Sequence, residues 1–554
     1  MDSNDELLNM RNLLVIASLL VLIACSQEEK SNLLPNIIWL VAEDQSPEFF
    51  PMYGNSTTAL PYLSSLANDG VVFDNAYSPV PVCAPARSAL ISGLYPSSLG
   101  THNMRTYNAY RKDNEPSIGI PSYSPPVPQG VKMFPEYLRA KGYYTTNNAK
   151  EDYNLKKTDG VWDESSSKAH WKNRGKNQAF FAVFNFGVTH ESQIWRRGQD
   201  SLLVDPKTVP VPPLFPDTEE VRKDIAVNYS NLIRLDRQIG KVIEQLKSDG
   251  LYENSIIFFY GDHGGPFPRY KRAVYETGIK VPLIIKFPML ENAGNRNPDF
   301  ISFIDYAPTV LSLAGIVPPE VMQGKAQFGV HKADKKLKFI FASSDRFDEQ
   351  VDRLRAVRHG KFKYIRNFNP EISNAIPVAY REQMAMMQLL NRLWEAGELD
   401  EYAAAWFKIP KPKEELYDLE QDPYELNNLA DQTALQDTLI FLRNRLDEWI
   451  VETGDLGAYP EKELLEKWLP EGKPKTLAAL YSVVKDNKIE LSHSDPGVSI
   501  VWKQTQDSVW SVYTTPLEKS KSIQAKAVRI GYADSPILKI DLYYSAQILD
   551  AEEK

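Results

Sequence analysis

Two short polar pairs in the chain could bind a metal ion together. Glu43 and Asp44 follow one continuous apolar run, and Asp262 and His263 follow another. If both runs are strands of an open α/β sheet, the pairs lie beyond the carboxyl ends of the strands, where such sheets bind their ligands. Carboxylate oxygens favour calcium or magnesium over zinc. Each pair alone could equally belong to a solvated loop, but two pairs at matching places predict a divalent-cation site.

The second chemical feature is Cys83, one of only two cysteines among 554 residues. It opens the sequence Cys83-Ala84-Pro85-Ala86-Arg87. In a chain of this composition, cysteine, proline and arginine at this spacing arise by chance roughly 0.02 times, so the pattern points to a function. If a helix begins near Ala86, Arg87 lies about one turn from Cys83 and faces the same site, and the helix aims its N–H groups at an anion. The alternative is a small buried hydrophobic thiol.

The Cys83 segment resembles the signature of the type I sulfatases of the alkaline phosphatase superfamily. The resemblance lies in the C-x-P-x-R pattern and in the following sequence SALISG. In that family the cysteine is oxidised to formylglycine, whose hydrate has two hydroxyls: one attacks the sulfur of a sulfate ester, and the other later expels the sulfate. The family usually has Asp-Asp at the first polar pair, which leaves open whether Glu43 binds the ion directly or through water. The resemblance implies one Ca²⁺ per chain, held by Glu43, Asp44, Cys83 in its oxidised form, Asp262 and His263.

Further catalytic residues are implied by the same resemblance. Lys150 and His190 each follow an apolar segment, and Lys271 opens the sequence KRAVYE. As in the family, Lys150 and Lys271 would neutralise sulfate oxygens, and His190 would protonate the leaving sugar oxygen. Arg87 would hold the hydrated aldehyde. Alone, each lysine would be an ordinary solvated surface residue.

One position departs from the family pattern. Many members have a histidine two places after the first lysine, whereas this chain has Asp152. This carboxylate is a candidate for the base that regenerates the aldehyde, and the alternative is an ion-pair partner of Lys150. Contacts with sugar hydroxyls are the expected role of four further residues, with surface salt bridges as the alternative: His102, Arg105, Asp345 and Arg346.

The pattern of apolar runs predicts the fold class α/β. Short continuous runs separated by helical stretches are typical of a mostly parallel sheet that is covered on both faces. We expect a helix from about Asp224 to Leu246, because its apolar residues recur at three- and four-residue multiples. The expected strands are 37–41, 143–146, 180–184, 256–260 and 281–285.

The chain is long enough for several domains. The resemblance implies a catalytic domain over 35–325, with an alkaline-phosphatase-like central sheet flanked by helices, and a smaller α+β subdomain over 326–460. Alternating apolar and polar residues predict an appended small antiparallel β-sandwich over 470–550. Its Trp502 and Trp510 are candidates for sugar binding or for the core of that domain.

The N-terminal segment resembles a bacterial lipoprotein signal. The apolar run 13–24 is too short to span a bilayer. It ends in the sequence LIACS, which places a lipid on Cys25 and makes residues 1–24 a cleaved signal peptide. Acidic residues near Met1 fit such a signal badly, so Met10 is an alternative start. We therefore expect an exported outer-membrane lipoprotein, anchored to the membrane through Cys25 and facing the periplasm or the cell surface.

Charge and resemblance together define the expected function. A net charge of −9 argues against nucleic acid as a partner, whereas local lysines and arginines can still bind an anionic substrate. We expect a sulfatase acting on sulfate esters of a polysaccharide or its oligosaccharides, of the ulvan, carrageenan or glycosaminoglycan type. A formylglycine-generating or anaerobic sulfatase-maturating enzyme would be its maturation partner. The alternatives are a sulfamidase, a phosphonate or phosphodiester hydrolase of the same superfamily, and a glycan-binding surface lipoprotein with a decayed enzyme fold.

Overall fold

The computed structural model of the chain describes residues 34–107, 120–519 and 522–541. The predicted signal peptide, the lipid site at Cys25 and the alternative start at Met10 lie outside these residues. Within the described ranges, no helix is both long enough and apolar enough to cross a membrane. The described residues from Pro35 onwards form one compact unit, so the predicted domain boundaries inside it stay predictions.

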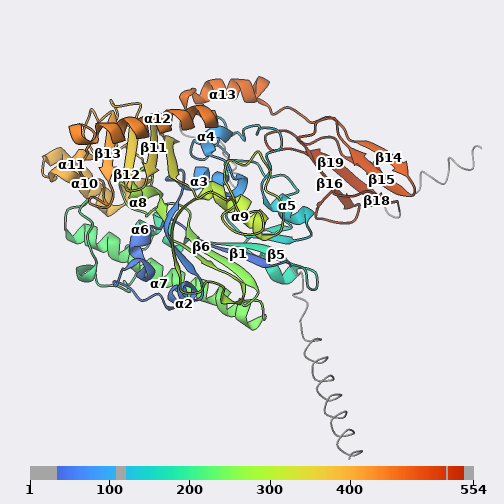
Figure 1. The fold of residues 1–554 in the computed structure, drawn as a ribbon, viewed down its shortest axis with the longest axis horizontal. Helices are drawn as coiled ribbons and strands as arrows, with labels where there is room; N and C mark the ends of the chain where they lie inside the picture. The colour runs from blue at the N-terminus through green and yellow to red at the C-terminus, as the bar shows by residue number, and fades with distance from the viewer. Residues whose placement is uncertain (1–33, 108–119, 520–521, 542–554) are drawn as a thin grey trace, which may run out of the picture. The chain divides into compact units, whose positions relative to one another are not determined.

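A nine-stranded sheet is the largest sheet of the described residues (Figure 1). Its strand order is β4-β3-β5-β1-β6-β8-β2-β7, and β9 pairs with β2. The strands are β1 (Asn36–Ala42), β2 (Val71–Tyr77), β3 (Tyr144–Asn148), β4 (Glu164–Ser165), β5 (Phe180–Phe186), β6 (Ser255–Gly261), β7 (Lys280–Val281), β8 (Leu283–Lys286) and β9 (Arg296–Ser302). The neighbours from β4 to β6 are parallel, so their carboxyl ends lie at one edge. The predicted α/β class is confirmed.

The last predicted strand, 281–285, differs from the prediction. Pro282 has no N–H to donate to a ladder, and it separates β7 from β8. β8 runs antiparallel to β6. Its connection from β6 contains the short helix α8 (Glu276–Ile279) and β7. The sequence pattern also does not predict β2, because Asp74 and Asn75 interrupt its apolar run.

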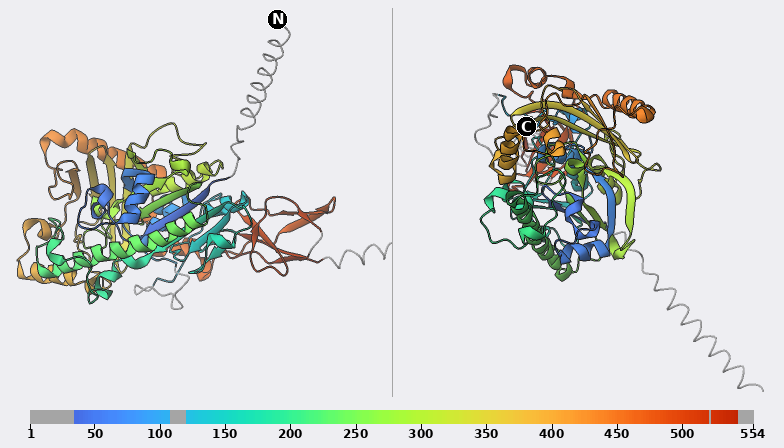
Figure 2. Two further views of the ribbon diagram at one scale, coloured as in Figure 1. Left: turned by 90° about the horizontal axis from the view of Figure 1, so that it is seen from below. Right: turned by 90° about the vertical axis from the view of Figure 1, so that its left-hand side faces the viewer.

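Helices cover both faces of this sheet. On one face, α2 (Pro61–Asp69) and α7 (Glu219–Ser248) share a buried apolar cluster with alternate residues of β1, β5 and β6. Figure 2 shows α7 lying along the sheet. On the other face, α9 (Tyr306–Leu313) packs an aromatic ring against Trp39 of β1. The helix predicted over 224–246 is confirmed as part of α7, which extends beyond it at both ends.

A four-stranded antiparallel sheet follows the central sheet in the chain. Its strands, in spatial order, are β10 (Phe339–Phe347), β11 (Gln350–His359), β12 (Phe362–Asn367) and β13 (Glu414–Asp418). The helix α12 (Gln436–Thr453) packs on this sheet, where Trp449 stacks on Phe341 with the ring centroids 5.0 Å apart. This helix-covered antiparallel sheet is the arrangement expected for an α+β subdomain.

Two small antiparallel sheets lie near the end of the described chain. One contains β14 (Tyr481–Lys485), β15 (Lys488–Ser492) and β18 (Leu517–Glu518), and the other contains β17 (Ser511–Val512), β16 (Ser499–Gln504), β19 (Ile523–Val528) and β20 (Leu538–Ile540). Residues of β15 and β19 share one apolar core, as in a sandwich. Trp502 packs against this core. The Trp510 ring has the ammonium groups of Lys503 and Lys526 at 5.1 and 4.9 Å from its centroid.

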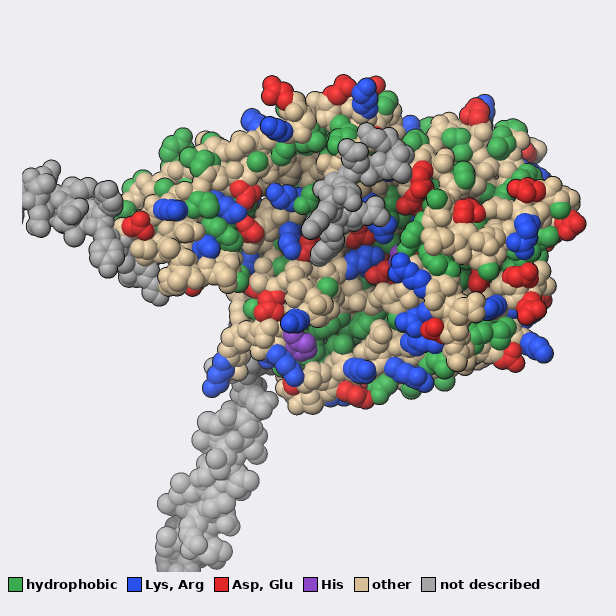
Figure 3. All heavy atoms as spheres, turned by 180° about the vertical axis from the view of Figure 1, so that it is seen from behind, with side chains coloured by type: hydrophobic (Ala, Val, Ile, Leu, Met, Phe, Trp, Pro, Cys, Tyr) green, Lys and Arg blue, Asp and Glu red, His purple; other side chains and the backbone are tan. Residues whose placement is uncertain are grey.

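Charged side chains of both signs are distributed over the surface. On the face shown in Figure 3, lysine and arginine side chains are interspersed with aspartate and glutamate. Exposed ion pairs such as Arg392 with Glu220, at 3.9 Å, typically contribute about 0–1 kcal/mol each. Buried ion pairs matter more for stability, because a buried charge that loses its partner has no water to replace it.

We expect Arg355→Ala to destabilise the protein strongly. Arg355 lies in β11 with 0% exposure, and it donates to Asp345 Oδ1 at 2.9 Å and to both Asp455 oxygens at 2.7 and 2.8 Å. Removing the guanidinium takes away the closest cation of two buried carboxylates, although Arg353 still lies 3.4 Å from Asp455. Breaking a buried ion pair typically costs about 3–5 kcal/mol. Thermal unfolding should show a Tm several degrees lower, with almost no change for the control Arg392→Ala, which removes only an exposed ion pair. Similar shifts in both variants would contradict the prediction.

Candidate active site

Four side chains from three elements meet at the carboxyl end of the central sheet. Asp44 follows β1, Asp262 and His263 follow β6, and Cys83 is the first residue of the helix α3 (Cys83–Ser92). The ligand atoms of these four residues all lie within 4.8 Å of one another. His263 Nε2 is 3.0 Å from Asp44 Oδ1 and 3.3 Å from Cys83 Sγ. All four side chains are fully buried. Because their ligand atoms are close enough together to hold a metal ion, we call these four residues the metal cluster.

The donor set of the metal cluster fits a single divalent cation. Two atoms bound to one calcium at about 2.3–2.6 Å from it lie at most about 5 Å apart, and the four ligand atoms satisfy this limit. The carboxylate oxygens of Asp44 and Asp262 suit calcium or magnesium, while His263 adds a nitrogen donor. The Cys83 thiol stands where an oxygen of formylglycine would join the set.

Neighbouring charges keep the metal cluster ionised. Burial raises the pKa of Asp44, but Lys271 and other cations lower it more, so that this pKa lies well below its usual value. Burial lowers the pKa of His263, whereas Asp262 raises it, with a net value of about 10. Burial raises the pKa of the Cys83 thiol, and neighbouring lysine ammonium groups lower it to about 6. Burial raises the pKa of Asp262, but His263 and Arg87 lower it to about 2. Both carboxylates are therefore charged at neutral pH, whereas His263 is protonated and must release its proton to bind a cation.

The helix that carries Cys83 begins earlier than predicted. The sequence predicts a start near Ala86, whereas α3 starts at Cys83 itself. Arg87 consequently lies one turn into the helix, with Nε and Nη2 at 3.1 and 2.9 Å from Asp262 Oδ2. Its Nη1 donates to Asn185 Oδ1 at 2.6 Å. Sequence analysis missed Asn185, because one polar residue near the end of an apolar strand carries no motif.

Glu43 lies beside the metal cluster and is not part of it. Its Oε2 is 3.1 Å from Lys150 Nζ and 4.0 Å from His190 Nε2. Burial raises the pKa of Glu43, but Lys150 and His190 lower it more, so that the net pKa is below its usual value. The structure therefore places this carboxylate against two predicted catalytic residues, and its role as a metal ligand stays a prediction.

Lys271 and His190 lie next to each other at the metal cluster. Lys271 Nζ is 2.8 Å from Asp44 Oδ2, 3.0 Å from Glu191 Oε1 and 3.3 Å from His190 Nε2. His190 Nδ1 is 2.9 Å from Ser192 Oγ, which orients the ring. Burial lowers the pKa of Lys271, whereas Asp44 raises it well above its usual value. Lys271 therefore carries a charge in a buried position beside a histidine.

Sequence analysis missed two buried charged residues that support this arrangement. Glu191 accepts hydrogen bonds from Arg272 Nη1 and Nη2 at 2.9 and 3.0 Å. Arg272 Nε also donates at 2.7 Å to Asp348 Oδ2, and Asp348 lies in the turn between β10 and β11. The only available signal was adjacency, since Glu191 follows His190 and Arg272 follows Lys271.

Asp152 lies close to two cationic side chains, Lys150 and Arg105. Its Oδ2 is 3.7 Å from Lys150 Nζ, and its Oδ1 is 3.8 Å from Arg105 Nε. Burial raises the pKa of Asp152, but Arg105 and Lys150 lower it more, so that the net pKa is below its usual value. This position of Asp152 is compatible with both roles considered from the sequence, the base that regenerates the aldehyde and the ion-pair partner of Lys150.

The other predicted sugar-contact residues are buried. Arg346 Nη2 donates to Glu461 Oε1 at 2.8 Å, and Asp345 Oδ1 accepts from Arg355 Nη2 at 2.9 Å. These are buried ion pairs and not the surface salt bridges considered from the sequence. Among the described residues, Asp345 Oδ2 and His102 Nδ1 have no hydrogen-bond partner. A sugar contact by His102, Asp345 or Arg346 stays a prediction.

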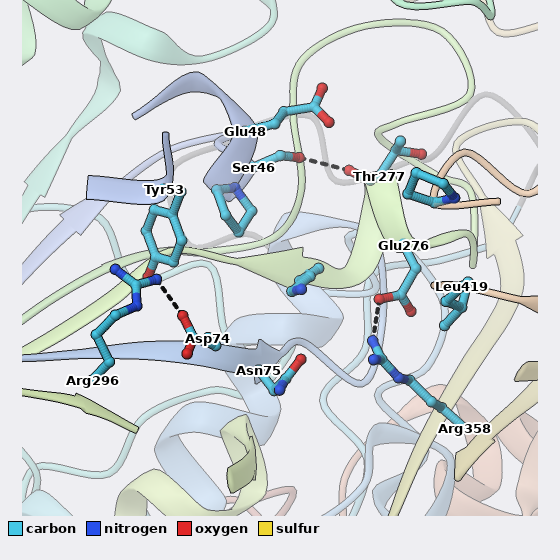
Figure 4. A pocket seen from close by; sticks show the side chains of 13 residues that line it. Ser46, Glu48, Tyr53, Asp74, Asn75, Glu276, Thr277, Arg296, Arg358 and Leu419 are labelled. Carbon is cyan, nitrogen blue, oxygen red and sulfur yellow. Dashed lines mark hydrogen bonds and ion pairs between the residues drawn. The ribbon is translucent and has the colours of Figure 1, made fainter. Parts of the chain in front are cut away.

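A separate pocket of about 400 Å³ lies beside the loop that follows Asp44 (Figure 4). Arg358 lies 2.5 Å from Glu276 at one side of it, and Ser46 Oγ donates to Thr277 O at 2.8 Å. No residue of the metal cluster lines this pocket. Its lining residues are Ser46, Pro47, Glu48, Tyr53, Asp74, Asn75, Glu276, Thr277, Lys280, Arg296, Arg358, Leu419 and Pro423.

The fold combines a mostly parallel sheet with a buried cluster of two carboxylates, a histidine and a cysteine at the carboxyl ends of its strands. Residues 35–316 match the family described as Sulfatase, and residues 261–376 match the C-terminal region described for N-sulphoglucosamine sulphohydrolase. The chain belongs to the sulfatase family, and it is a sulfuric ester hydrolase.

Similar proteins come from bacteria and from humans. The chain is 40% identical over 550 residues to an ulvan-active sulfatase of Formosa agariphila, covering 91% of each chain. It is 25% identical over 504 residues to N-sulphoglucosamine sulphohydrolase of Homo sapiens, covering 83% of this chain and 97% of the relative.

Solved structures share the fold at lower identity. One is a protein in complex with its substrate D-glucosamine-2-N,6-O-disulfate, with a TM-score of 0.55 and 17% identity, covering 76% of this chain and 98% of that chain. Another is the phosphonate monoester hydrolase of Agrobacterium radiobacter, with a TM-score of 0.54 and 15% identity, covering 76% and 96% of the two chains. At these identities the match shows the fold alone.

We expect Glu191→Gln to lower kcat/KM for an aryl sulfate by about 100-fold, because small displacements of charged groups at a reaction centre have effects of this size. The neutral amide no longer holds Lys271 and Arg272, which both contact Glu191. Kinetics and circular dichroism of the purified variant check the prediction. The matched control is Glu452→Gln, an exposed partner of Arg445, and it should keep full activity. An unchanged kcat/KM in Glu191→Gln would rule out this role.

Proposed function

We propose that this sulfatase removes sulfate ester groups from ulvan or ulvan oligosaccharides. The proposal rests on the 40% identity over 91% of each chain to an ulvan-active sulfatase. Relatives named for amino-sugar sulfates are about 25% identical. A substrate of the ulvan type therefore has more support than one of the glycosaminoglycan type.

The proposed roles of the charged side chains follow from their positions. Lys271 Nζ lies 2.8 Å from Asp44 Oδ2 and Lys150 Nζ lies 3.1 Å from Glu43 Oε2, and both ammonium groups lower the pKa of Cys83. There they would stabilise negative charge on sulfate oxygens during reaction. His190, with Ser192 Oγ at 2.9 Å from its Nδ1, would donate a proton to the leaving sugar oxygen through Nε2.

The metal cluster would hold calcium through Asp44, Asp262, His263 and the oxidised side chain at position 83. When bound, calcium adds positive charge next to the sulfate oxygens, and formylglycine supplies a hydrated aldehyde as the nucleophile. Arg87 would orient Asp262, because two of its nitrogens lie 3.1 and 2.9 Å from Oδ2. Asp152 stays a candidate for the base that acts when sulfate leaves.

The alternative functions have less support. N-sulphoglucosamine sulphohydrolase of Homo sapiens is 25% identical, against 40% for the ulvan-active sulfatase. The match to a phosphonate monoester hydrolase has 15% identity and concerns the fold alone. A decayed glycan-binding lipoprotein would have no reason to keep Cys83, Arg87, Lys150 and the buried Lys271 together around a metal cluster.

The proposal also includes export and maturation. The apolar run 13–24 and Cys25 support an outer-membrane lipoprotein that faces the periplasm or the cell surface. A formylglycine-generating or anaerobic sulfatase-maturating enzyme would oxidise Cys83. Sequence resemblance supports both steps, and the membrane and the maturation enzyme would be the corresponding partners.

We expect Cys83→Ala to abolish sulfate release while leaving the fold intact, since the substitution removes one sulfur atom but also the precursor of the nucleophile. Sulfate release, thermal unfolding and peptide mass spectrometry check this. The active wild-type enzyme should contain an aldehyde at position 83. Full activity with an unmodified thiol, or turnover by the variant, would contradict the assignment.

We expect Asp262→Asn to lose bound calcium and most activity, because a site with few charged oxygen ligands depends strongly on each of them. Metal analysis and kinetics with added calcium measure both effects. The matched control is Asp305→Asn, since Asp305 is a buried carboxylate that accepts backbone N–H bonds from Lys325 and Ser302. This control should retain calcium. The absence of any divalent ion from active wild-type enzyme would refute the metal assignment.

A substrate panel tests the proposed function itself. Purified, matured enzyme is incubated with oligosaccharides from ulvan, carrageenan and glycosaminoglycans, with N-sulfoglucosamine and with an aryl phosphonate, and released sulfate or phosphonate product is measured. We expect the highest kcat/KM on ulvan oligosaccharides. A higher value on any other member of the panel would reject the ulvan assignment and identify the better substrate class.

A further inference from the structure

A long connection between two paired strands reaches the candidate active site. β12 and β13 are antiparallel neighbours, and hairpins of this kind usually need loops of about two to five residues. The connection here spans 368–413 and contains the 3-10 turn η8 (Arg381–Gln383), the helix α10 (Ala385–Ala396) and the helix α11 (Glu401–Ala405). Connections of this length in compact domains are often functional.

The connection is packed firmly against the catalytic part of the chain. Met386, Met387, Leu389 and Leu390 of α10 belong to the same buried apolar cluster as α7. The Met386 N–H donates to Asp224 Oδ2 on α7 at 2.7 Å. The segment that precedes α10 is therefore held at a defined place beside the central sheet.

Tyr380, at the end of this segment, lies next to His190. The Tyr380 and His190 ring centroids are 6.2 Å apart, with an angle of 61° between the ring planes. Trp195, in the short helix α6 (Ser192–Arg196), meets Tyr380 edge to face at 5.0 Å and 80°. All three rings are half-buried, so each keeps surface that a ligand can contact.

The buried side chain of Arg381, the next residue in the chain, fixes the position of Tyr380. The Arg381 side chain is 2% exposed, donates from Nη2 to Ile376 O at 2.5 Å, and lies with its guanidinium 5.0 Å from the Trp406 ring centroid. A buried side chain held in this way allows little movement of its neighbour. The Tyr380 ring is consequently held at a defined position beside Trp195. We call Tyr380 and Trp195 the aromatic wall.

We infer that Tyr380 and Trp195 form a carbohydrate-binding subsite that contacts the sugar ring bearing the sulfate ester. The inference rests on the proposed function, in which His190 protonates the oxygen of this sugar. Aromatic rings bury the apolar C–H faces of a ligand, while the few polar groups around them fix its orientation. The aromatic wall lies beside His190, which in the proposed function donates a proton to the sugar oxygen. Lys150 and Lys271 would bind the sulfate group of the same substrate.

Kinetics with two ligands separates sugar binding from sulfate binding. Tyr380→Ala and Trp195→Ala should each raise KM for ulvan oligosaccharides about tenfold, equivalent to ~1.4 kcal/mol, with kcat changed by less than about threefold. The Ki of inorganic sulfate, which has no sugar ring, should stay unchanged. Tyr380→Phe should keep the wild-type KM, because it retains the ring.

The control variant lies in the same connection. Trp394 of α10 is 39% exposed and stacks on Phe407 at 5.4 Å, so Trp394→Ala should leave KM and Ki unchanged. An unchanged KM in both wall variants, or a Ki for sulfate that rises in parallel with KM, would overturn the inference while leaving sulfatase activity established. A wild-type enzyme that releases no sulfate from ulvan oligosaccharides would instead refute the proposed substrate, and the inferred subsite with it.

Discussion

Charge compensation at the carboxyl end of the central sheet is the constraint on which the site depends. Buried carboxylates are stable there only when cations neutralise them, because an unpaired buried charge has lost its hydration. Lys271 lies 2.8 Å from Asp44, Arg87 lies 2.9 Å from Asp262, and Lys150 lies 3.1 Å from Glu43. The same cations that balance these carboxylates in the fold are available to a sulfate group, so stability and anion binding depend on one set of side chains.

This compensation continues from the sheet into the C-terminal antiparallel sheet. Arg272 joins Glu191 to Asp348 in the turn after β10, and Lys363 of β12 lies 2.9 Å from Glu425 and 3.4 Å from Glu276. The second sheet therefore supplies partners for charges near the active site. Its long connection 368–413 also brings Tyr380 to His190. The sheet β10–β13 and its connection 368–413 therefore contribute side chains to the candidate active site as well as to the fold.

Much of the central fold was predictable because apolar runs are a local property of the chain. Continuous runs such as 37–41 and 256–260 must be buried on both faces, which requires a covered parallel sheet. The direction of β8 and the existence of β2 were not predictable, because strand pairing depends on which segments meet in space. The start of α3 was misplaced by a turn, since Pro85 suits the first turn of a helix that begins at Cys83 as well as one that begins near Ala86.

The sequence by itself determined the chemistry of the site. Cys83 with Arg87, the polar pairs after two strands, and Lys150, His190 and Lys271 resemble the sulfatase pattern, and this resemblance implies sulfate ester hydrolysis. Tertiary structure alone decided which of these side chains share one cluster, and it placed Glu43 with Lys150 outside the metal cluster. It also added Asn185, Glu191, Arg272 and Tyr380. Asn185 and Tyr380 carry no local signal, and Glu191 and Arg272 are marked only by their adjacency to His190 and Lys271. Their positions depend on contacts between segments that are far apart in the chain.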